Sequence, residues 1–285
     1  MKKIGALVLA LSLTLSLTAC GQKAEQTAAQ EEPESGEAEP VELVVFAAAS
    51  MTETLTEIAD LYQDAAPNVT LTFNFGSSGT LLTQIEEGAE CDLFISAAST
   101  QMNALDGTLA QDAEKNPDGL DMLVPGSRID LLENKVTLAV PEGNPKGIES
   151  FDQLAQLLAD GSVFLAMGNS DVPVGQYTQK IFAYYGLDEA SLAESGVLTY
   201  GSDVKEVTTQ VSEAAVDCGV IYATDAFSAG LTVVDSATPE MCGQVIYPAA
   251  VIRGGNEEAA QAFLDYLQTD EAMAVFESVG FSPAF

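Results

Sequence analysis

Small polar residues follow buried-strand patterns in this 285-residue chain, at points where helical patterns begin. Ser50 and Ser78 stand at two of these points, and Val174 and Val204 lie just inside two further helix starts. The first backbone N–H groups of a helix lack intrahelical acceptors, and a helix start carries about half a positive charge. Such amides and nearby hydroxyls donate hydrogen bonds to small anions. Four starts that met in one place would form an anion site.

Each start also has an interpretation that needs no ligand. Ser50 with Glu53 three residues later matches a capping box, which predicts Ser50 as the N-cap of a helix over residues 52–64. Ser78 fits a cap in the same way. Tyr222 ends a buried-strand pattern, where a tyrosine commonly packs in the core with its hydroxyl satisfied. The set of starts, rather than any single one, favours binding.

Composition excludes several classes of function. The chain has 10 Lys plus Arg against 43 Asp plus Glu, a net charge of −33, so it offers no basic patch for nucleic acid. It has no His, which excludes a Ser-His-Asp triad and His-ligated zinc. Gly76-Ser77-Ser78-Gly79-Thr80 lacks the final Gly of a nucleophile elbow, so a serine hydrolase is also disfavoured. We expect a protein that is not an enzyme.

The first forty residues have the pattern of an export signal followed by a tether. Two lysines precede an apolar core over residues 4–17, and Leu17-Thr18-Ala19-Cys20 resembles the bacterial lipobox. We therefore expect residues 1–20 to be a lipoprotein signal peptide with Cys20 lipidated, although an ordinary signal peptide fits the apolar core too. Residues 21–40 are predicted to be a disordered acidic tether. The expected location is extracytoplasmic, anchored by lipid to the cell membrane.

Hydrophobic periodicity predicts two α/β units in series. Strands at residues 42–46, 69–75 and 92–96 alternate with helices, as do strands at residues 136–140, 163–167, 197–200 and 219–222. A strand at residues 245–252, interrupted by Pro248, is expected at an edge or a crossing, before a helical end. The fold class is α/β with two lobes and a central ligand cleft: lobe I over residues 41–134 plus 247–285, lobe II over 135–246.

The elements of such a fold place the helix starts together. In open α/β sheets a ligand binds beyond the carboxyl ends of the strands, so two facing lobes direct their helix starts into one cleft. The three remaining cysteines, Cys91, Cys218 and Cys242, lack metal-site spacing. A Cys218–Cys242 disulfide and buried free thiols both remain open. No residue is expected to ligate a metal directly.

Six segments together resemble the periplasmic molybdate-binding proteins of ABC importers. They are Phe46-Ala47-Ala48-Ala49-Ser50-Met51-Thr52, Phe75-Gly76-Ser77-Ser78-Gly79-Thr80-Leu81, Asp92-Leu93-Phe94-Ile95-Ser96-Ala97, Val172-Pro173-Val174-Gly175-Gln176-Tyr177, Asp203-Val204 and Gly219-Val220-Ile221-Tyr222-Ala223-Thr224-Asp225-Ala226. The resemblance implies a type II fold that closes on one molybdate or tungstate dianion. It assigns the ligand to the hydroxyls and amides of Ser50 and Ser78, the backbone N–H groups of Val174 and Val204, and the hydroxyl of Tyr222.

The implied function is capture of molybdate or tungstate and delivery to an ABC permease. Molybdenum would be held as the oxyanion by the same five residues, as a transported ligand with no cofactor, in a monomer. The family often has Ala at the position of Val174, and Ser or Thr is also common at that of Gly79. The alternatives are a binding protein for sulfate or another tetrahedral oxyanion, which only cavity size would distinguish, and a structural lipoprotein whose helix starts are merely capped.

Overall fold

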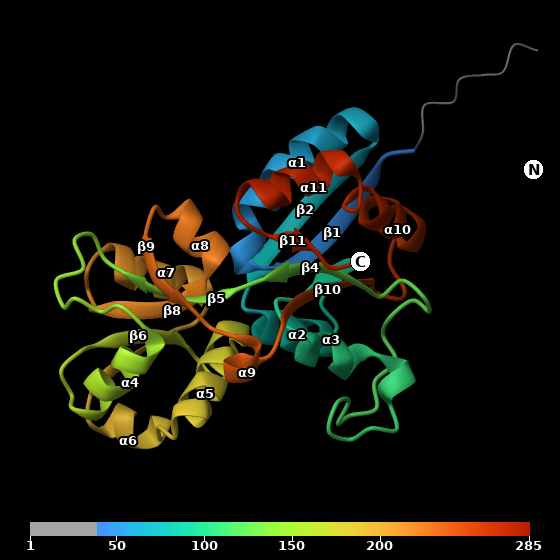
Figure 1. The fold of residues 1–285 in the computed structure, drawn as a ribbon. Helices are drawn as coiled ribbons and strands as arrows, with labels where there is room; N and C mark the ends of the chain where they lie inside the picture. The colour runs from blue at the N-terminus through green and yellow to red at the C-terminus, as the bar shows by residue number, and fades with distance from the viewer. Residues whose placement is uncertain (1–38) are drawn as a thin grey trace, which may run out of the picture. The chain divides into compact units, whose positions relative to one another are not determined.

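The computed structural model describes residues 39–285, so the predicted signal peptide, Cys20 and nearly all of the tether lie outside the described residues. Two β-sheets with helices packed on them make up the described body (Figure 1). None of the helices in this part of the chain is long and apolar enough to cross a membrane.

The first sheet has six strands in the order β11-β4-β10-β3-β1-β2. The strands β1, β2 and β3 run parallel to one another, and β10 runs antiparallel to both β3 and β4. Helices α1 and α11 lie on one face of this sheet, and α2 and α3 lie on the other (Figure 1). The strand bounds are β1 Val41–Ala48, β2 Val69–Gly76, β3 Leu93–Ile95, β4 Ile129–Asn134, β10 Val245–Val251 and β11 Ser282–Pro283.

The second sheet has five strands in the order β7-β6-β8-β5-β9. Here β6 is parallel to β7 and β8, and β5 is antiparallel to β8 and β9. The strand bounds are β5 Val136–Val140, β6 Leu165–Gly168, β7 Leu198–Gly201, β8 Cys218–Tyr222 and β9 Thr232–Ser236.

The helices and 3₁₀ turns connect these strands. Those that belong with the first sheet are η1 Ala49–Met51, α1 Thr52–Ala65, α2 Ser78–Glu86, α3 Ser99–Leu105, η2 Gly107–Leu109, α10 Glu257–Tyr266 and α11 Asp270–Ser278. Those that follow second-sheet strands are α4 Phe151–Ala159, α5 Pro173–Tyr185, α6 Glu189–Glu194, α7 Val204–Ser212, α8 Ala223–Ser228 and α9 Pro239–Cys242. Below, each sheet with its helices is called a half of the body.

The two sheets repeat one arrangement. The order β2-β1-β3-β10-β4 in the first matches β7-β6-β8-β5-β9 in the second, with the fourth strand antiparallel in both. In each sheet that fourth strand is the first strand after the chain crosses from the other half: β5 follows β4 after Lys135 alone, and β10 follows β9 and α9. The chain therefore crosses between the halves twice, and the carboxyl ends of the parallel strands of both sheets meet between them.

Burial follows from the apolar runs that predicted the strands. The strand β5 is buried along its whole length, and so is β8. The internal strands of each sheet are covered by helices on both faces, which explains why their sequences are nearly continuous apolar runs instead of alternating ones. The expected parallel βαβαβ opening of the chain is confirmed by the pairing of β1 with β2 and β3.

Pro248 does not place its strand at an edge. The strand β10 lies inside the first sheet, between β3 and β4, and the register shifts between Tyr247 and Pro248. This irregularity accommodates a residue that has no N–H to donate to the ladder. The expectation of an edge strand was therefore wrong, while the expectation of a crossing agrees with the chain path.

The three cysteines of the described body are free thiols. Cys91, Cys218 and Cys242 are all buried and unpaired in the structure, so the alternative of free thiols holds over a Cys218–Cys242 disulfide. Burial raises the pKa of the Cys91 thiol to about 12, which keeps it protonated and unreactive.

Candidate functional site

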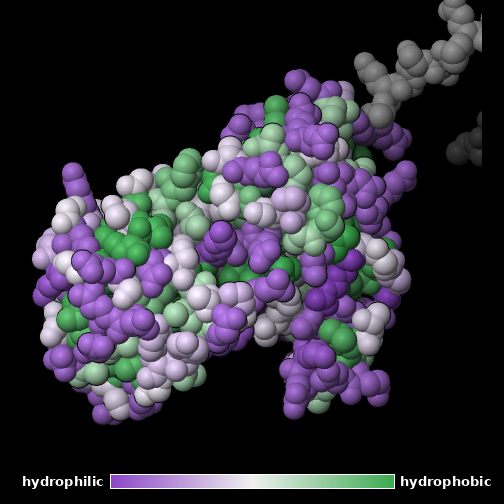
Figure 2. All heavy atoms as spheres, viewed as in Figure 1, coloured by the Kyte–Doolittle hydropathy of each residue, from purple (hydrophilic) through white to green (hydrophobic). Residues whose placement is uncertain are grey.

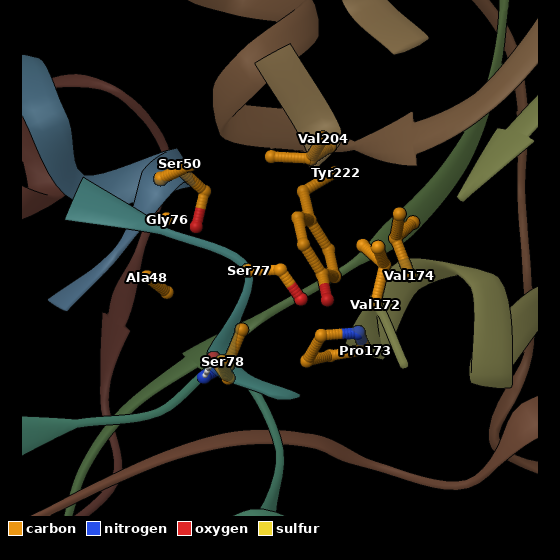
Figure 3. Close-up of a pocket in the computed structure, with 12 residues that line it drawn as sticks. Ala48, Ser50, Gly76, Ser77, Ser78, Val172, Pro173, Val174, Val204 and Tyr222 are labelled. Carbon is orange, nitrogen blue, oxygen red and sulfur yellow. Dashed lines mark hydrogen bonds between the residues drawn. The ribbon is translucent and has the colours of Figure 1, made fainter. Parts of the chain in front are cut away.

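A small hollow lies where the two halves meet, and all five sequence-predicted site residues line it (Figure 3). The first half contributes three serines and small neighbours, and the second contributes two helix starts and Tyr222. The lining consists of Ala48, Ala49, Ser50, Gly76, Ser77, Ser78, Ala97, Val172, Pro173, Val174, Val204 and Tyr222. Each of these residues stands at or just beyond the carboxyl end of a strand, which is where an open α/β sheet binds its ligands.

Ser50 is held differently from the capping box that its sequence predicts. It lies in the 3₁₀ turn η1, and α1 starts after Met51, which makes no side-chain cap. The Ser50 Oγ instead lies 3.0 Å from the hydroxyl of Tyr247. The predicted cap is therefore wrong, and the Ser50 hydroxyl is placed in the hollow rather than on its own helix.

Ser77, and not Ser78, caps α2. The Ser77 Oγ accepts a hydrogen bond from the Gly79 amide and donates one to the Asp171 carbonyl of the other half, 3.1 Å away. The Ser78 Oγ accepts a hydrogen bond of 2.9 Å from the Ala97 amide. Because this bond uses a lone pair, the Ser78 hydroxyl hydrogen remains free to be donated within the hollow.

Val174 and Val204 supply main-chain donors. Val174 is the second residue of α5, after Pro173, and Val204 is the first residue of α7, whose N-cap Asp203 accepts from the Glu206 amide. Across residues 39–285, neither the Val174 nor the Val204 amide has a hydrogen-bond acceptor. Both side chains are buried, so the apolar groups shield the two N–H groups from bulk water.

Two glycines beside the hollow allow neighbouring segments of backbone to approach each other closely. A Cβ on Gly175 would lie 2.1 Å from the Asn169 carbonyl oxygen, so glycine lets the start of α5 pack against the end of β6. A Cβ on Gly79 would lie 2.1 Å from the Asp171 carbonyl oxygen, across the contact between the halves. Any side chain at position 79 would therefore clash with the backbone of the other half.

Tyr222 presents a buried hydroxyl without a partner. The residue is 1% exposed, and its hydroxyl oxygen forms no hydrogen bond within the described chain. Burial, with smaller contributions from Tyr247, Tyr177 and Asp225, raises the pKa of the Tyr222 hydroxyl well above its ordinary value. The group is therefore a neutral O–H donor. An unsatisfied buried hydroxyl costs about 1–3 kcal/mol, which is unusual outside a ligand site.

The hollow is tight. Its space for the centre of a water-sized sphere is about 10 Å³, close to the least that holds one water molecule. No formally charged side chain lines it. Its donors are hydroxyls and amides in surroundings of low dielectric, where hydrogen bonds to an anion are strengthened and the protein's many carboxylates on the surface are screened.

Ion pairs centred on Lys205 join the two halves beside the hollow. Lys205, next to Val204, has its Nζ 2.6 Å from Glu53 Oε2 of α1 and 3.4 Å from Asp225 Oδ1 of α8. The Asp225 side chain is fully buried, and neither carboxylate oxygen has a hydrogen-bond partner in the described body. Desolvation raises its pKa to about 7, although Lys205 lowers it in part. Lys205 is therefore neutralised by acids and leaves no net positive charge for a ligand.

Sequence reasoning missed the polar residues behind the hollow. Tyr247 was assigned only to a strand, and Asn134 to no strand or helix, yet Tyr247 contacts Ser50 and Asn134 contacts Tyr247 through hydrogen bonds. The nearest sequence signal was Pro248, which indicated that its strand crosses between the lobes. It did not indicate that the hydroxyl of the neighbouring Tyr247 contacts Ser50. The pairing of Lys205 with Glu53 joins residues 152 positions apart, which no local pattern reports.

Comparison with known proteins defines the class. A family model described as bacterial extracellular solute-binding protein matches residues 43–282, and the chain belongs to this family. A Bacillus subtilis protein named as an ABC transporter substrate-binding lipoprotein, YvgL, is 32% identical over 288 residues, which cover 99% of this chain and 98% of that protein. The molybdate-binding protein ModA of Haemophilus influenzae is 30% identical over 242 residues, which cover 84% and 89%.

Among solved structures, the periplasmic molybdate-binding protein of Azotobacter vinelandii superposes with a TM-score of 0.70, covering 85% of this chain and all of that one. Its identity of 20% makes this a likeness of fold. The predicted fold class, and the family resemblance read from the six segments, are confirmed. The family binds solutes, so the prediction that the chain is not an enzyme is confirmed too.

Asp225 predicts a pH-dependent stability. An ordinary Asp pKa is near 3.9 when unfolded, and the folded value is about 7, so the folded state binds the proton more tightly. The stabilisation this gives is present at acid pH and is lost as pH rises towards 7. Relative to Asp225→Asn, the wild-type free energy of unfolding should fall by up to about 4 kcal/mol between pH 4 and 7.

Urea denaturation at both pH values measures this difference. Asp60→Asn, the same change at an exposed position of α1, is the matched control and should show no comparable trend. An Asp225→Asn effect of equal size at pH 4 and pH 7 would contradict the prediction.

Proposed function

We propose that this protein captures molybdate, or the closely similar tungstate, outside the cytoplasm and delivers it to the membrane subunits of an ABC permease. The observation that carries the proposal is the convergence of Ser50, Ser78, Val174, Val204 and Tyr222 on one hollow. These are the residues that the family resemblance assigns to the oxyanion, and they come from both halves. The relatives named for molybdate support the choice of ligand.

The chemistry of the donors suits a fully deprotonated dianion. Molybdate at neutral pH offers only acceptors, and the hollow offers hydroxyl and amide donors with no acidic side chain in its lining. Hydrogen bonds to a charged group contribute about 1.5–3 kcal/mol each. After the costs of association and closure, several such bonds leave a binding free energy on the order of −8 to −12 kcal/mol, or micromolar to nanomolar affinity.

The tightness of the hollow supports a movement of the halves. The hollow has space for little more than one water molecule, and an ion with four oxygens is larger than a water molecule. The halves are therefore proposed to part as lobes, residues 41–134 plus 247–285 against 135–246, and to close again on the ion. The two crossings of the chain, at Lys135 and between β9 and β10, are the natural hinges. The Ser77 to Asp171 bond and the Lys205 to Glu53 pair form again on closure.

The proposed setting is the outer face of the cell membrane. Cys20 would carry the lipid, residues 21–40 would be the tether, and the protein would act as a monomer. The lipobox-like sequence supports this, as does the lipoprotein name of the Bacillus subtilis relative. Mass spectrometry of the membrane fraction, with Cys20→Ser as the comparison, would detect the lipid.

Calorimetric titration tests the ligand directly. We expect one molybdate to bind per protein, tungstate to bind similarly, and hydrogen phosphate not to bind at the same concentration, because a bound phosphate proton would meet only donors. Tighter binding of sulfate than of molybdate would transfer the assignment to sulfate. Failure of all four oxyanions to bind would leave a structural lipoprotein as the better reading.

The serine hydroxyls should each matter for affinity. We expect Ser50→Ala and Ser78→Ala each to weaken molybdate binding about ten-fold or more, since each removes one donor to the ion. Thermal melting should show that both variants fold. Ser195→Ala is the control, because it removes a hydroxyl bound to the Leu192 carbonyl far from the hollow. Unchanged affinity in both site variants would contradict the assignment.

Tyr222→Phe should separate binding from stability. The hydroxyl has no partner in the described body, so its removal should leave the thermal midpoint of the ligand-free protein unchanged or raise it. The same variant should bind molybdate about ten-fold more weakly because it lacks a donor. Melting curves with and without molybdate measure both effects. A lower midpoint without ligand, combined with normal binding, would show that the hydroxyl serves the fold instead.

A further inference from the structure

A buried chain of hydrogen bonds leads from the first crossing of the backbone to Ser50. Asn134, the last residue of β4, donates through its Nδ2 to the Tyr247 hydroxyl at 3.2 Å and to Thr224 Oγ1 at 2.9 Å. The Tyr247 hydroxyl lies 3.0 Å from Ser50 Oγ. Tyr247 is fully buried, and Asn134 and Ser50 are nearly so. Neither Tyr247 nor Asn134 lines the hollow.

The direction of every bond in this chain can be worked out. The Lys135 amide donates to Asn134 Oδ1 at 2.8 Å, and because a backbone N–H can only donate, the amide oxygen must face it. The Nδ2 group therefore faces Tyr247, and the Tyr247 oxygen accepts. The other hydrogen bond of the Tyr247 hydroxyl in the described body is the 3.0 Å contact with Ser50 Oγ. The opposite direction would leave a buried O–H with no acceptor, so Tyr247 donates to Ser50.

Ser50 is thereby left with its own hydrogen unused. Its oxygen already accepts from Tyr247, so its O–H can point only to another acceptor, and the hollow is the space that it borders. Ser78 is in the same state, because its oxygen accepts from the Ala97 amide. Both serines are thus fixed as donors by neighbours that supply hydrogens from behind them.

We propose that Tyr247 and Asn134 are positioning residues that fix the Ser50 hydroxyl as a hydrogen-bond donor and so restrict the site to oxyanions carrying no proton. This inference rests on the proposed function and adds to it a physical origin for the selectivity against protonated oxyanions such as hydrogen phosphate. A serine free to rotate could accept from the O–H of hydrogen phosphate. A serine that already accepts from Tyr247 keeps a second lone pair, but using it to accept from the ligand would turn its own hydrogen away from the ligand, the one acceptor left to it. A protonated ligand therefore leaves one hydrogen unpaired, and the site rejects it.

The test measures molybdate and phosphate affinities for Tyr247→Phe, Ser50→Ala and the double variant. Tyr247→Phe keeps the ring that packs edge-on against Tyr222 and Phe281, so the fold should persist. We expect molybdate affinity to fall about ten-fold and the molybdate-to-phosphate affinity ratio to fall further, because the freed Ser50 can also accept. Tyr266→Phe, which loses a surface hydroxyl bound to Glu271, should behave as wild type.

The double variant identifies the route of the effect. If Tyr247 acts through Ser50, Tyr247→Phe should cost little more once Ser50 is already alanine, a clear failure of additivity. Asn134→Ala, measured in parallel, should show the same dependence on Ser50, since without its donor the Tyr247 oxygen is free to accept from the serine.

The outcomes are distinguishable. The inference is overturned if Tyr247→Phe weakens molybdate binding equally with and without the Ser50 hydroxyl. It is also overturned if the molybdate-to-phosphate affinity ratio does not change. Either result leaves the proposed function standing. A wild-type protein that binds no oxyanion would remove the proposed function itself. If Tyr247→Phe does not fold, Asn134→Ala with and without Ser50→Ala decides the question.

Discussion

The proposed site depends on one constraint: the groups that it directs at its ligand must be donors, and none may bring a formal charge. A protein with a net charge of −33 repels anions at long range. Over short distances, amides at helix starts and hydroxyls in a dry pocket outweigh that repulsion, because screening weakens distant charges and desolvation strengthens close hydrogen bonds. Pairing of the nearby Lys205 with two acids keeps the site neutral.

This constraint explains the duplicated strand order. A single sheet can direct donors at one side of an ion, whereas two sheets of the same arrangement, facing each other, surround it. Because the chain enters each sheet at its fourth strand directly after a crossing, the two halves are connected across the gap in which the carboxyl ends of the parallel strands meet. Figure 2 shows the contrasting outer surface, which is largely hydrophilic on the face drawn, with only scattered apolar side chains.

Much of this could be predicted from the sequence, because the signals were local. The apolar run over residues 136–140 located β5. Pro173 and Gly186 are residue types typical of a helix start and a helix end, and Gly186 ends α5 in a left-handed conformation, with φ +68°. The five site residues were assigned through the family resemblance, which motifs at strand ends carry. The errors arose where tertiary contacts decide: Ser50 and Glu53 form a capping pattern in sequence, yet their side chains contact Tyr247 and Lys205 instead. The position of β10 inside the sheet was likewise set by pairing with β3 and β4, not by Pro248.

The path of the chain has a consequence for how the protein is made. The first sheet needs β10 and β11, which are the last strands to leave the ribosome, so its centre stays open until almost the whole chain has been synthesised. Contacts between such distant segments form slowly, since closing a long loop costs entropy before any pairing is gained. An N-terminal piece of this chain therefore cannot settle into a native half ahead of the rest. Such late folding suits a member of an extracellular family, whose chain has to leave the cytoplasm.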